Sequence, residues 1–506
     1  MTVPQVAPRT RLGLEIVAAG VVGGIVGDQL LGVMPWGLNM ALGTAALVGT
    51  GAWLVRRHKI KPGPDAAWLA LTALLLGLAF LRRDAQPLDA FDALALIGTL
   101  AMAAASVQGE TIARWYPFDW IRGVVTAALA SIVGGIQLIF GDIQWRQLPQ
   151  EDRLRHFRRA LLGVLIATPL LLIFAALFAS ADPVFGNVMS NLFNFNAETV
   201  IRHTFFIGFW GFLVAGYFRW SLLGRPLHGV TPTLKPIQSV VPLATALVLI
   251  DLLFLLFVVV QLRYFFGGSS VVEETSGLTY AEYARRGFFE LMTASILVLP
   301  ILLGAEALVH TGTVPQIRVF RQLAGLLLML LAVVMISALQ RMRLYVAAFG
   351  LSAQRLYATA VMVLLFGMLA WFAWTVLRGR RDRFVFGSLM QALAVLAGLH
   401  LLNPDAYIVN HNLSRPAVER PFDARYAVSL GGDAVPPLLS ALPRLGAEDR
   451  CVVIRGLLRK WDQAEVDWRT WNWSRARARS LVRHQAGPLK AELVTCPAPK
   501  EGRNDH

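Results

Sequence analysis

The sequence predicts an all-α protein, a polytopic transmembrane helical bundle of about 11–12 spans with a small helical C-terminal tail domain. Of its 506 residues, 56% are hydrophobic and 16% are charged, whereas about a quarter of the residues of soluble domains are charged. The apolar residues gather into stretches of about 17 to 25, the length that crosses about 30 Å of hydrocarbon at 1.5 Å per residue. This composition excludes a water-soluble globular protein.

Twelve apolar stretches are predicted to be spans, and they divide the chain into three regions. N-terminal membrane helices occupy residues 1–158, core helices that carry the polar motifs occupy 159–402, and a polar, mainly helical tail occupies 403–506. The first stretch follows a short basic start without a small-residue cleavage site, so we interpret it as an uncleaved span. The predicted spans are 12–31, 35–55, 65–81, 90–108, 121–141, 159–180, 199–218, 240–262, 280–307, 321–340, 355–377 and 384–402.

Lys and Arg predict the orientation of these spans, because both accumulate in cytoplasmic loops. The N-terminus carries Arg9 and Arg11, and the loop 56–61 carries four cations, so both are expected in the cytoplasm. The loop 146–159 contains five arginines and is expected there too. Three predicted spans separate these loops, and an odd number cannot return to the same side. Either one of the three is re-entrant or interfacial, with 121–141 the first suspect, or one loop breaks the rule.

The same parity places the C-terminal tail on the external face, because seven predicted spans follow the loop 146–159. The net charge of +15 then reflects topology, and we expect no nucleic-acid partner. If the tail is external, Cys451 and Cys496 lie in an oxidising compartment and could pair, although unpaired thiols are at least as good an interpretation. No Cys/His cluster or nucleotide-binding motif is present, so we expect neither a metal nor a cofactor.

Asp251 is the most unusual single residue, because eleven uncharged residues separate it from the nearest following cation, Arg263. That spacing places Asp251 roughly 18 Å from the end of its helix, near the middle of the membrane. A charged Asp at this depth costs about 2.5 to 3.5 kcal/mol, so it is expected to face a partner or a water-filled cavity. A functional relay and a hydrogen-bonded lock between helices are equally good interpretations.

A polar segment opens the next predicted span at residues 278–290. Thr279 and Glu282 match a capping box, and Glu282, Arg286 and Glu290 follow one another at four-residue steps on one helix face. This stripe could grip an anionic or polar headgroup. A charge-paired interfacial anchor with a tyrosine belt is the favoured interpretation.

Two further spans are expected to end in arginine and tyrosine. Arg263 and Tyr264 precede Gly267 and Gly268, where the Asp251 helix is expected to stop. Arg341, Arg343 and Tyr345 are expected to end a later span in the same manner. By parity these arginines lie outside, against the usual bias. A shared anionic site would explain them, and a miscounted helix would explain them as well.

The last polar motifs lie in the tail. Residues 403–415 are rich in short hydrogen-bonding side chains and could line a polar site, but a helix stop and turn around Pro404 is favoured. Residues 467–479 mix Trp468, Trp471 and Trp473 with four arginines. Membrane contact or packing of the tail is favoured there over base stacking.

The segments RYFFGG, TYAEYARRGFFEL, RMRLY, NPDAYIVNHN and DWRTWNWSRARA occur in this order. Together they resemble the signature stretches of bacterial multi-pass proteins in the domain-of-unknown-function families 4153 and 4173. The resemblance covers roughly Asp251 to Leu481, and the N-terminal quarter is similar only in hydropathy. It implies a bacterial inner-membrane location and no catalytic role for any residue.

The leading hypothesis is an external polar site that handles a lipid or an anionic envelope molecule. A membrane-embedded transferase acting on a lipid-linked substrate is an alternative, with Glu282, Glu290 and Asp405 as its acidic candidates. A signalling or scaffold subunit that meets an envelope protein through its tail is another, and membrane lipids are expected partners in all three. We leave enzymatic activity open and favour its absence. The candidate polar site comprises Asp251, Arg263, Tyr264, Tyr280, Glu282, Tyr283, Arg285, Arg286, Glu290, Arg341, Arg343, Tyr345, Asn403, Asp405, Asn410, Asn412 and Arg415.

Overall fold

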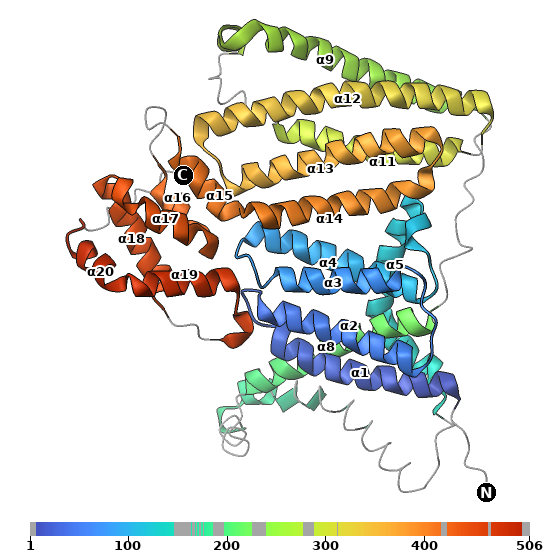
Figure 1. The fold of residues 1–506 in the computed structure, drawn as a ribbon. Coiled ribbons are helices and arrows are strands. Elements are labelled where there is room, and N and C mark those ends of the chain that lie inside the picture. The colour runs from blue at the N-terminus through green and yellow to red at the C-terminus, as the bar shows by residue number, and fades with distance from the viewer. Residues whose placement is uncertain are drawn as a thin grey trace, which may run out of the picture.

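The computed structural model describes residues 7–145, 197–224, 239–276, 288–310, 312–415, 422–463 and 467–497, with short pieces between 163 and 185. Its described part is an all-α bundle with a small helical domain at one end (Figure 1). The membrane-bundle helices are α1 (Pro8–Leu31), α2 (Leu38–Arg57), α3 (Ala66–Ala79), α4 (Gln86–Val107), α5 (Pro117–Gln137), α8 (Ala197–Leu223), α9 (Val241–Ser276), α11 (Phe288–Val309), α12 (Val314–Phe349), α13 (Ala353–Thr375) and α14 (Phe384–Leu402).

Ten helices of the described residues are long and apolar enough to cross a membrane. The predicted span 65–81 corresponds to α3, an apolar helix of 14 residues, and the predicted span 159–180 lies largely outside the described residues. The chain is therefore a multi-pass membrane protein. Exposed apolar side chains cover its helices, as in Leu94 (67% exposed) and Leu253 (64% exposed), because lipid rather than water is their solvent.

Close backbone contact holds the N-terminal helices together. A Cβ atom placed on Gly24 of α1 would lie 2.3 Å from the carbonyl oxygen of Ile207 in α8. One placed on Gly20 would lie 2.9 Å from the Cβ of Ala215. Small residues four positions apart allow this approach, which supplies van der Waals contact between helices in lipid.

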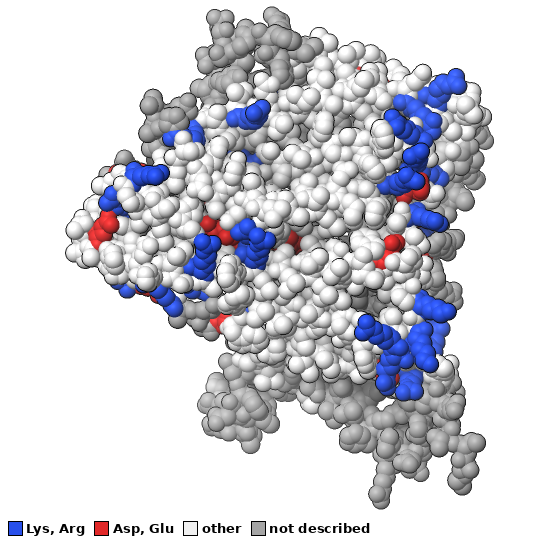
Figure 2. Space-filling model, in the orientation of Figure 1, with Lys and Arg blue, Asp and Glu red and all other residues white. Residues whose placement is uncertain are grey.

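The N-terminus and the tail lie at opposite ends of the bundle (Figure 1). Lys and Arg gather along the edge at the N-terminal end, and a smaller group lies where the tail meets the bundle (Figure 2). Both ends of α5 lie at the N-terminal end: Arg381 stacks on Tyr116, which precedes α5, and Arg9 pairs with Asp142 beyond its other end. The segment Asp119–Asp142 is nevertheless long and apolar enough to cross a membrane, so a re-entrant or interfacial 121–141 stays a prediction.

The tail has a hydrophobic core of its own, in which Val453, Ile454 and Val482 are fully buried. Cys451 and Cys496 form a disulfide across it, so the paired alternative is the one present. Its α-helices are α15 (Pro404–Leu413), α16 (Ala424–Ser429), α17 (Val435–Ala441), α18 (Ala447–Trp461), α19 (Trp473–His484) and α20 (Ala486–Val494). The short 3-10 and π segments of the chain are η1 (Ile112–Arg114), η2 (Leu138–Asp142), η4 (Val376–Arg378), η5 (Arg381–Arg383), η6 (Gly432–Ala434), η7 (Leu442–Arg444) and η8 (Trp468–Thr470).

Two predicted helix ends are wrong, and a third is correct but is not followed by the predicted turn. α9 continues through Gly267 and Gly268 to Ser276, because glycine lowers helix propensity without preventing a helix. α12 runs past Arg341 and ends at Gly350, whose φ of 81° suits glycine. Asn403 does stop α14 in a left-handed conformation, but α15 starts directly after it instead of a turn.

Candidate polar site on the tail side of the bundle

The tail is attached to the bundle through a buried arginine. Arg475, at 4% exposure, donates from Nη1 to Asp84 Oδ1 at 2.7 Å and from Nη2 to the carbonyl oxygens of Trp36 and Thr470. The other carboxylate oxygen of Asp84 accepts from the backbone N–H of Gly432 at 2.9 Å. A single ion pair thus ties α19 and η6 to the loop between α3 and α4.

Asn472 reinforces this attachment. It is fully buried, and its Nδ2 donates to the carbonyl oxygens of Phe80 and Arg83, both at 2.7 Å. Its Oδ1 accepts from the backbone N–H of Arg475, which caps α19. The backbone N–H of Trp473 also donates to Leu81 O at 2.7 Å. The 467–479 motif therefore packs the tail on the bundle, although Trp468 and Trp473 themselves remain exposed.

Arg83 makes the second connection. Its Nη1 donates to Asp433 Oδ1 at 3.0 Å, and its Nε and Nη2 donate to the carbonyl oxygen of His400 at the end of α14. Next to it, the backbone N–H of Gly431 donates to Asp405 Oδ2 at 2.7 Å. We call the contact region of Arg83, Asp84, Asp405, Asn472 and Arg475 the tail junction.

Acidic side chains lie directly beneath the tail junction, on the bundle side. Asp92 of α4 is 1% exposed and pairs with His400 Nε2 at 3.0 Å. Asp89 lies within electrostatic range of Asp92 and Asp405. The hydroxyl of Tyr357, also buried, has no hydrogen-bond partner among the described residues.

Burial controls the protonation of Asp405. It raises the pKa of this carboxyl to about 7, and the charges of Asp433 and Asp84 act in the same direction. The hydrogen bond from Gly431 opposes them. Burial likewise raises the pKa of Tyr426, whose hydroxyl accepts from the backbone N–H of Ala353 at 2.7 Å. The junction thus holds a carboxyl that titrates near neutral pH.

A second polar cluster surrounds the turn between α12 and α13. Arg355 stacks on the Tyr345 ring at 4.0 Å and donates to the carbonyl oxygen of Gly350. Asn412 of α15 accepts from the backbone N–H of Leu351 at 2.7 Å and donates to its carbonyl oxygen at 2.8 Å. Arg415 donates to the carbonyl oxygen of Ala347. The two arginines thus meet carbonyl groups at the negative end of the α12 dipole.

The structure places the predicted site residues in several groups. Tyr345, Asn412 and Arg415 come together at the α12–α13 turn, and Asp405 lies in the tail junction. Arg343 and Asn410 are exposed, Glu290 is exposed at the start of α11, and Asn403 ends α14. Arg263 and Tyr264 lie within α9, where only the backbone is described. Tyr280, Glu282, Tyr283, Arg285 and Arg286 lie outside the described residues.

Asp251 and Arg341 lie on the helix pair α9 and α12. Arg341 donates to Gln261 Oε1 at 2.9 Å, and Ser337 donates to the same oxygen at 2.8 Å. Asp251 is 4% exposed, and neither of its carboxylate oxygens has a hydrogen-bond partner among the described residues. A hydrogen-bonded lock at Asp251 therefore finds no partner in this part of the chain.

The sequence did not point to Arg83, Asp84, Asn472 or Arg475 as site residues. Their arrangement depends on contacts between segments nearly 400 positions apart, which no local pattern encodes. One local signal was available: Asn472 directly precedes α19, and Asn is a preferred residue type at the position before a helix. Within the described ranges, no group of three or more His, Cys, Asp or Glu side chains could hold a metal ion.

Comparison with protein families gives one match. A family model described as a domain of unknown function, DUF4153, matches residues 70–441. The match begins well before Asp251 and ends before the DWRTWNWSRARA motif, so the expected limits of the resemblance were wrong at both ends. From residue 70 on, the N-terminal region shares more than hydropathy with the family. No curated protein and no solved structure matches the chain.

Proposed function

We propose a function for this chain from the premise that it belongs to the DUF4153 family, which is described only as a domain of unknown function. We infer that the protein resides in a bacterial inner membrane, with its N-terminus in the cytoplasm and its tail outside. The cations at the N-terminal end support this orientation. The tail disulfide also supports it, because disulfides persist in oxidising compartments.

In this orientation, the external surface around the α12–α13 turn binds the anionic headgroup of a lipid or of another anionic envelope molecule. Arg343 carries the proposal: its side chain is exposed at the tail end of α12. It makes no hydrogen bond or ion pair with the described residues. Arg355 and Arg415 have a structural role, because each donates a hydrogen bond to a backbone carbonyl oxygen. Arg343 has no such contact with the described residues.

The length of α12 supports a position at headgroup level. Arg321 and Arg341 lie 20 residues apart with only uncharged residues between them, a separation of about 30 Å along a helix, which matches the hydrocarbon thickness. Arg343 then extends just beyond the apolar layer on the tail side. Phosphate groups of lipids and of envelope polymers occupy this level, and arginine is suited to binding them.

The geometry favours binding over the transferase alternative. Of the acidic candidates within the described residues, Asp405 is 4% exposed and held by Gly431, whereas Glu290 is exposed at the start of α11. A pair of carboxyl groups that shares one reaction centre needs a common accessible pocket. Asp405 offers no access to such a pocket.

Lipid retention tests the proposal. Full-length protein would be released from nanodiscs of mixed phosphatidylethanolamine and phosphatidylglycerol. Native mass spectrometry would then measure which lipids it retains. We expect Arg343→Gln to lower retention of phosphatidylglycerol about tenfold. Arg380→Gln, an exposed arginine at the opposite end of the bundle, is the matched control and should retain the wild-type amount. Equal retention by the two variants would exclude Arg343 as the anion site.

A further inference from the structure

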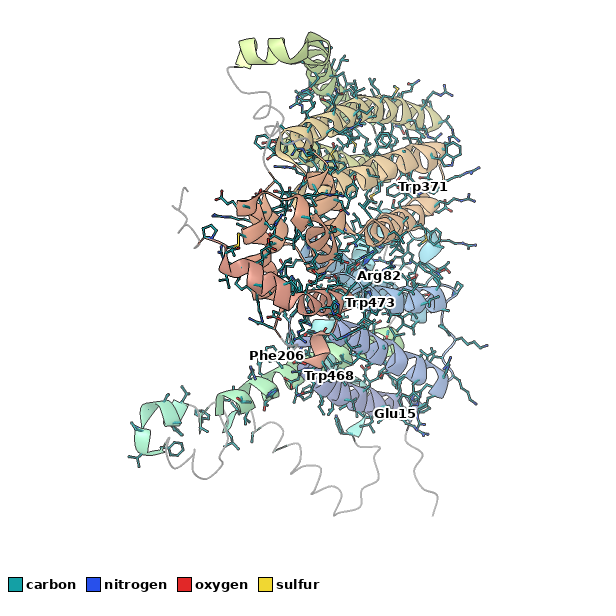
Figure 3. The ribbon with its side chains drawn as sticks, turned by 60° about the vertical axis from the view of Figure 1, so that its left-hand side comes forward. Glu15, Arg82, Phe206, Trp371, Trp468 and Trp473 are labelled. Atoms are coloured by element: carbon teal, nitrogen blue, oxygen red, sulfur yellow. A yellow bond between two sulfur atoms is a disulfide. The ribbon has the colours of Figure 1, made fainter. Side chains whose placement is uncertain are left out.

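A groove of about 630 Å³ lies where the tail overhangs the end of α1. Figure 3 labels Trp468 at this position, beside the ends of the N-terminal helices. One wall comes from the last two turns of α1 and the other from the segment 467–469. The lining residues are Ile25, Val26, Gln29, Leu30, Asp467, Trp468 and Arg469.

The α1 wall of the groove continues an exposed, mostly apolar face of the helix. Ala18, Val22, Ile25 and Gln29 are all exposed, and their spacing of four, three and four residues places them on one side of the helix. Val22 is 59% exposed and Ile25 is 48% exposed. An acyl chain that follows this stripe from the bilayer reaches the groove at Gln29.

The tail wall presents one positive and one negative charge. Arg469 Nη2 lies 2.6 Å from Asp467 Oδ2, and Arg469 Nη1 donates to the carbonyl oxygen of Gln29 at 2.6 Å. The guanidinium holds the pKa of Asp467 below its ordinary value, so both groups are charged at neutral pH. The wall is therefore dipolar with no net charge.

Trp468 marks the depth of the groove in the membrane. Its ring is 64% exposed although it belongs to the ordered η8 segment, and Trp473 nearby in the chain is 60% exposed. Tryptophan concentrates at the boundary between acyl chains and headgroups, because its ring is apolar and its N–H is polar. We therefore expect the groove at headgroup level on the tail side.

We propose that this groove binds a zwitterionic, amine-bearing phospholipid, with one acyl chain along the Ala18–Gln29 stripe and the headgroup beneath residues 467–469. The phosphate would face Arg469 and the amine would face Asp467. Charge complementarity favours this lipid over an anionic one, because Asp467 repels a headgroup that carries only negative charge. The site uses none of the residues of the α12–α13 turn, so it stands or falls separately from the proposed function.

Native mass spectrometry of the full-length protein tests the site. The protein would be released from nanodiscs of phosphatidylethanolamine and phosphatidylglycerol in equal amounts. Val26→Trp fills the groove, and Leu94→Trp adds the same ring to an exposed position on α4. We expect Val26→Trp to retain about tenfold less phosphatidylethanolamine than Leu94→Trp. Retention of phosphatidylglycerol should be the same in both variants, because neither substitution changes a charged residue.

A charge variant gives a second readout that does not depend on filling the groove. Asp467→Asn keeps a side-chain acceptor for the backbone N–H of Arg469 but leaves the tail wall positive. We expect the groove of this variant to exchange phosphatidylethanolamine for phosphatidylglycerol. If Asp467→Asn leaves the retained lipids unchanged, or if Val26→Trp retains as much phosphatidylethanolamine as Leu94→Trp, the proposal is overturned. A wild-type protein that retains phosphatidylglycerol only would overturn it as well.

Discussion

Arg475 in the tail and Asp84 in the α3–α4 loop form an ion pair at 2.7 Å across a sequence separation of 391 residues. Their side chains are only 5% and 17% exposed. The pair therefore lies in a region of low dielectric, where an isolated charge is costly. It makes the tail an integral part of the bundle instead of an appendage on a linker.

Removing the charge of Arg475 should detach the tail. We expect Arg475→Gln to lower the free energy of unfolding by about 3 to 5 kcal/mol, because Asp84 would remain buried without its partner. Arg477→Gln, two residues away and exposed, should change it by less than about 0.5 kcal/mol. Thermal unfolding in detergent and hydrogen exchange at Gly432 measure the effect. Similar unfolding of the two variants would show that the pair does not hold the tail.

Substitution of Asn472 should lower the free energy of unfolding, because its side chain makes buried hydrogen bonds. We expect Asn472→Ala to cost about 1 to 3 kcal/mol, because the carbonyl groups of Phe80 and Arg83 would lose their buried donor. Asn472→Asp should cost more than Asn472→Ala, since a carboxylate would face the same two carbonyl oxygens. Asn410→Ala, at an exposed Asn, is the control. If Asn472→Asp destabilised the protein less than Asn472→Ala, the role of Asn472 as a donor would be contradicted.

The junction should lose stability as the pH rises. The folded protein raises the pKa of Asp405 from 3.8 to about 7, so between these values the folded state holds a proton that the unfolded chain releases. The stabilisation is complete below about pH 4 and is lost as the pH passes through about 7, at a cost of about 4 kcal/mol at most.

Two substitutions at Asp405 separate charge from hydrogen bonding. Asp405→Asn should remove the pH dependence and unfold at a higher temperature than wild type at about pH 8, because an amide oxygen can still accept from Gly431. Asp405→Ala should also remove the pH dependence but unfold at a lower temperature than Asp405→Asn. Unfolding temperatures of wild type that stay constant from about pH 5 to about pH 8 would rule out this titration.

The disulfide should stabilise the tail. Cys451 and Cys496 are separated by 45 residues, and closing a loop of that length contributes about 4 kcal/mol in the chain-entropy model. We expect the double variant Cys451→Ser and Cys496→Ser to unfold its tail first, with early hydrogen exchange in α18. The intact mass of protein purified without reductant reports the pairing. Two free thiols in that protein would argue against an external tail.

The contact between α1 and α8 should not tolerate a methyl group. We expect Gly24→Ala to cost about 1 to 3 kcal/mol, because the new Cβ would lie 2.3 Å from the backbone oxygen of Ile207. At Gly98 of α4 nothing lies within 4 Å of such an atom, so Gly98→Ala should be neutral or slightly stabilising. Equal thermal unfolding of the two variants would place α1 and α8 further apart than the structure does.

The sequence by itself determined that this protein consists largely of apolar helices in a membrane. Backbone N–H and C=O groups cannot remain unpaired in hydrocarbon, so long apolar stretches must form helices, and ten such helices are present in the described residues. These conclusions rest on local composition and need no knowledge of which helix packs on which.

Only the tertiary structure decided how the tail and the bundle meet. Arg83, Asp84, Asn472 and Arg475 resemble ordinary loop and helix residues in the sequence, and nothing local distinguishes Arg475 from Arg477 as the buried one. Folding brings their segments together, and the energy of a buried charge depends on what surrounds it. The sequence does not show which helices pack together. The predicted site residues therefore fall into several groups, because residues at a similar position along their helices are neighbours only where those helices are in contact.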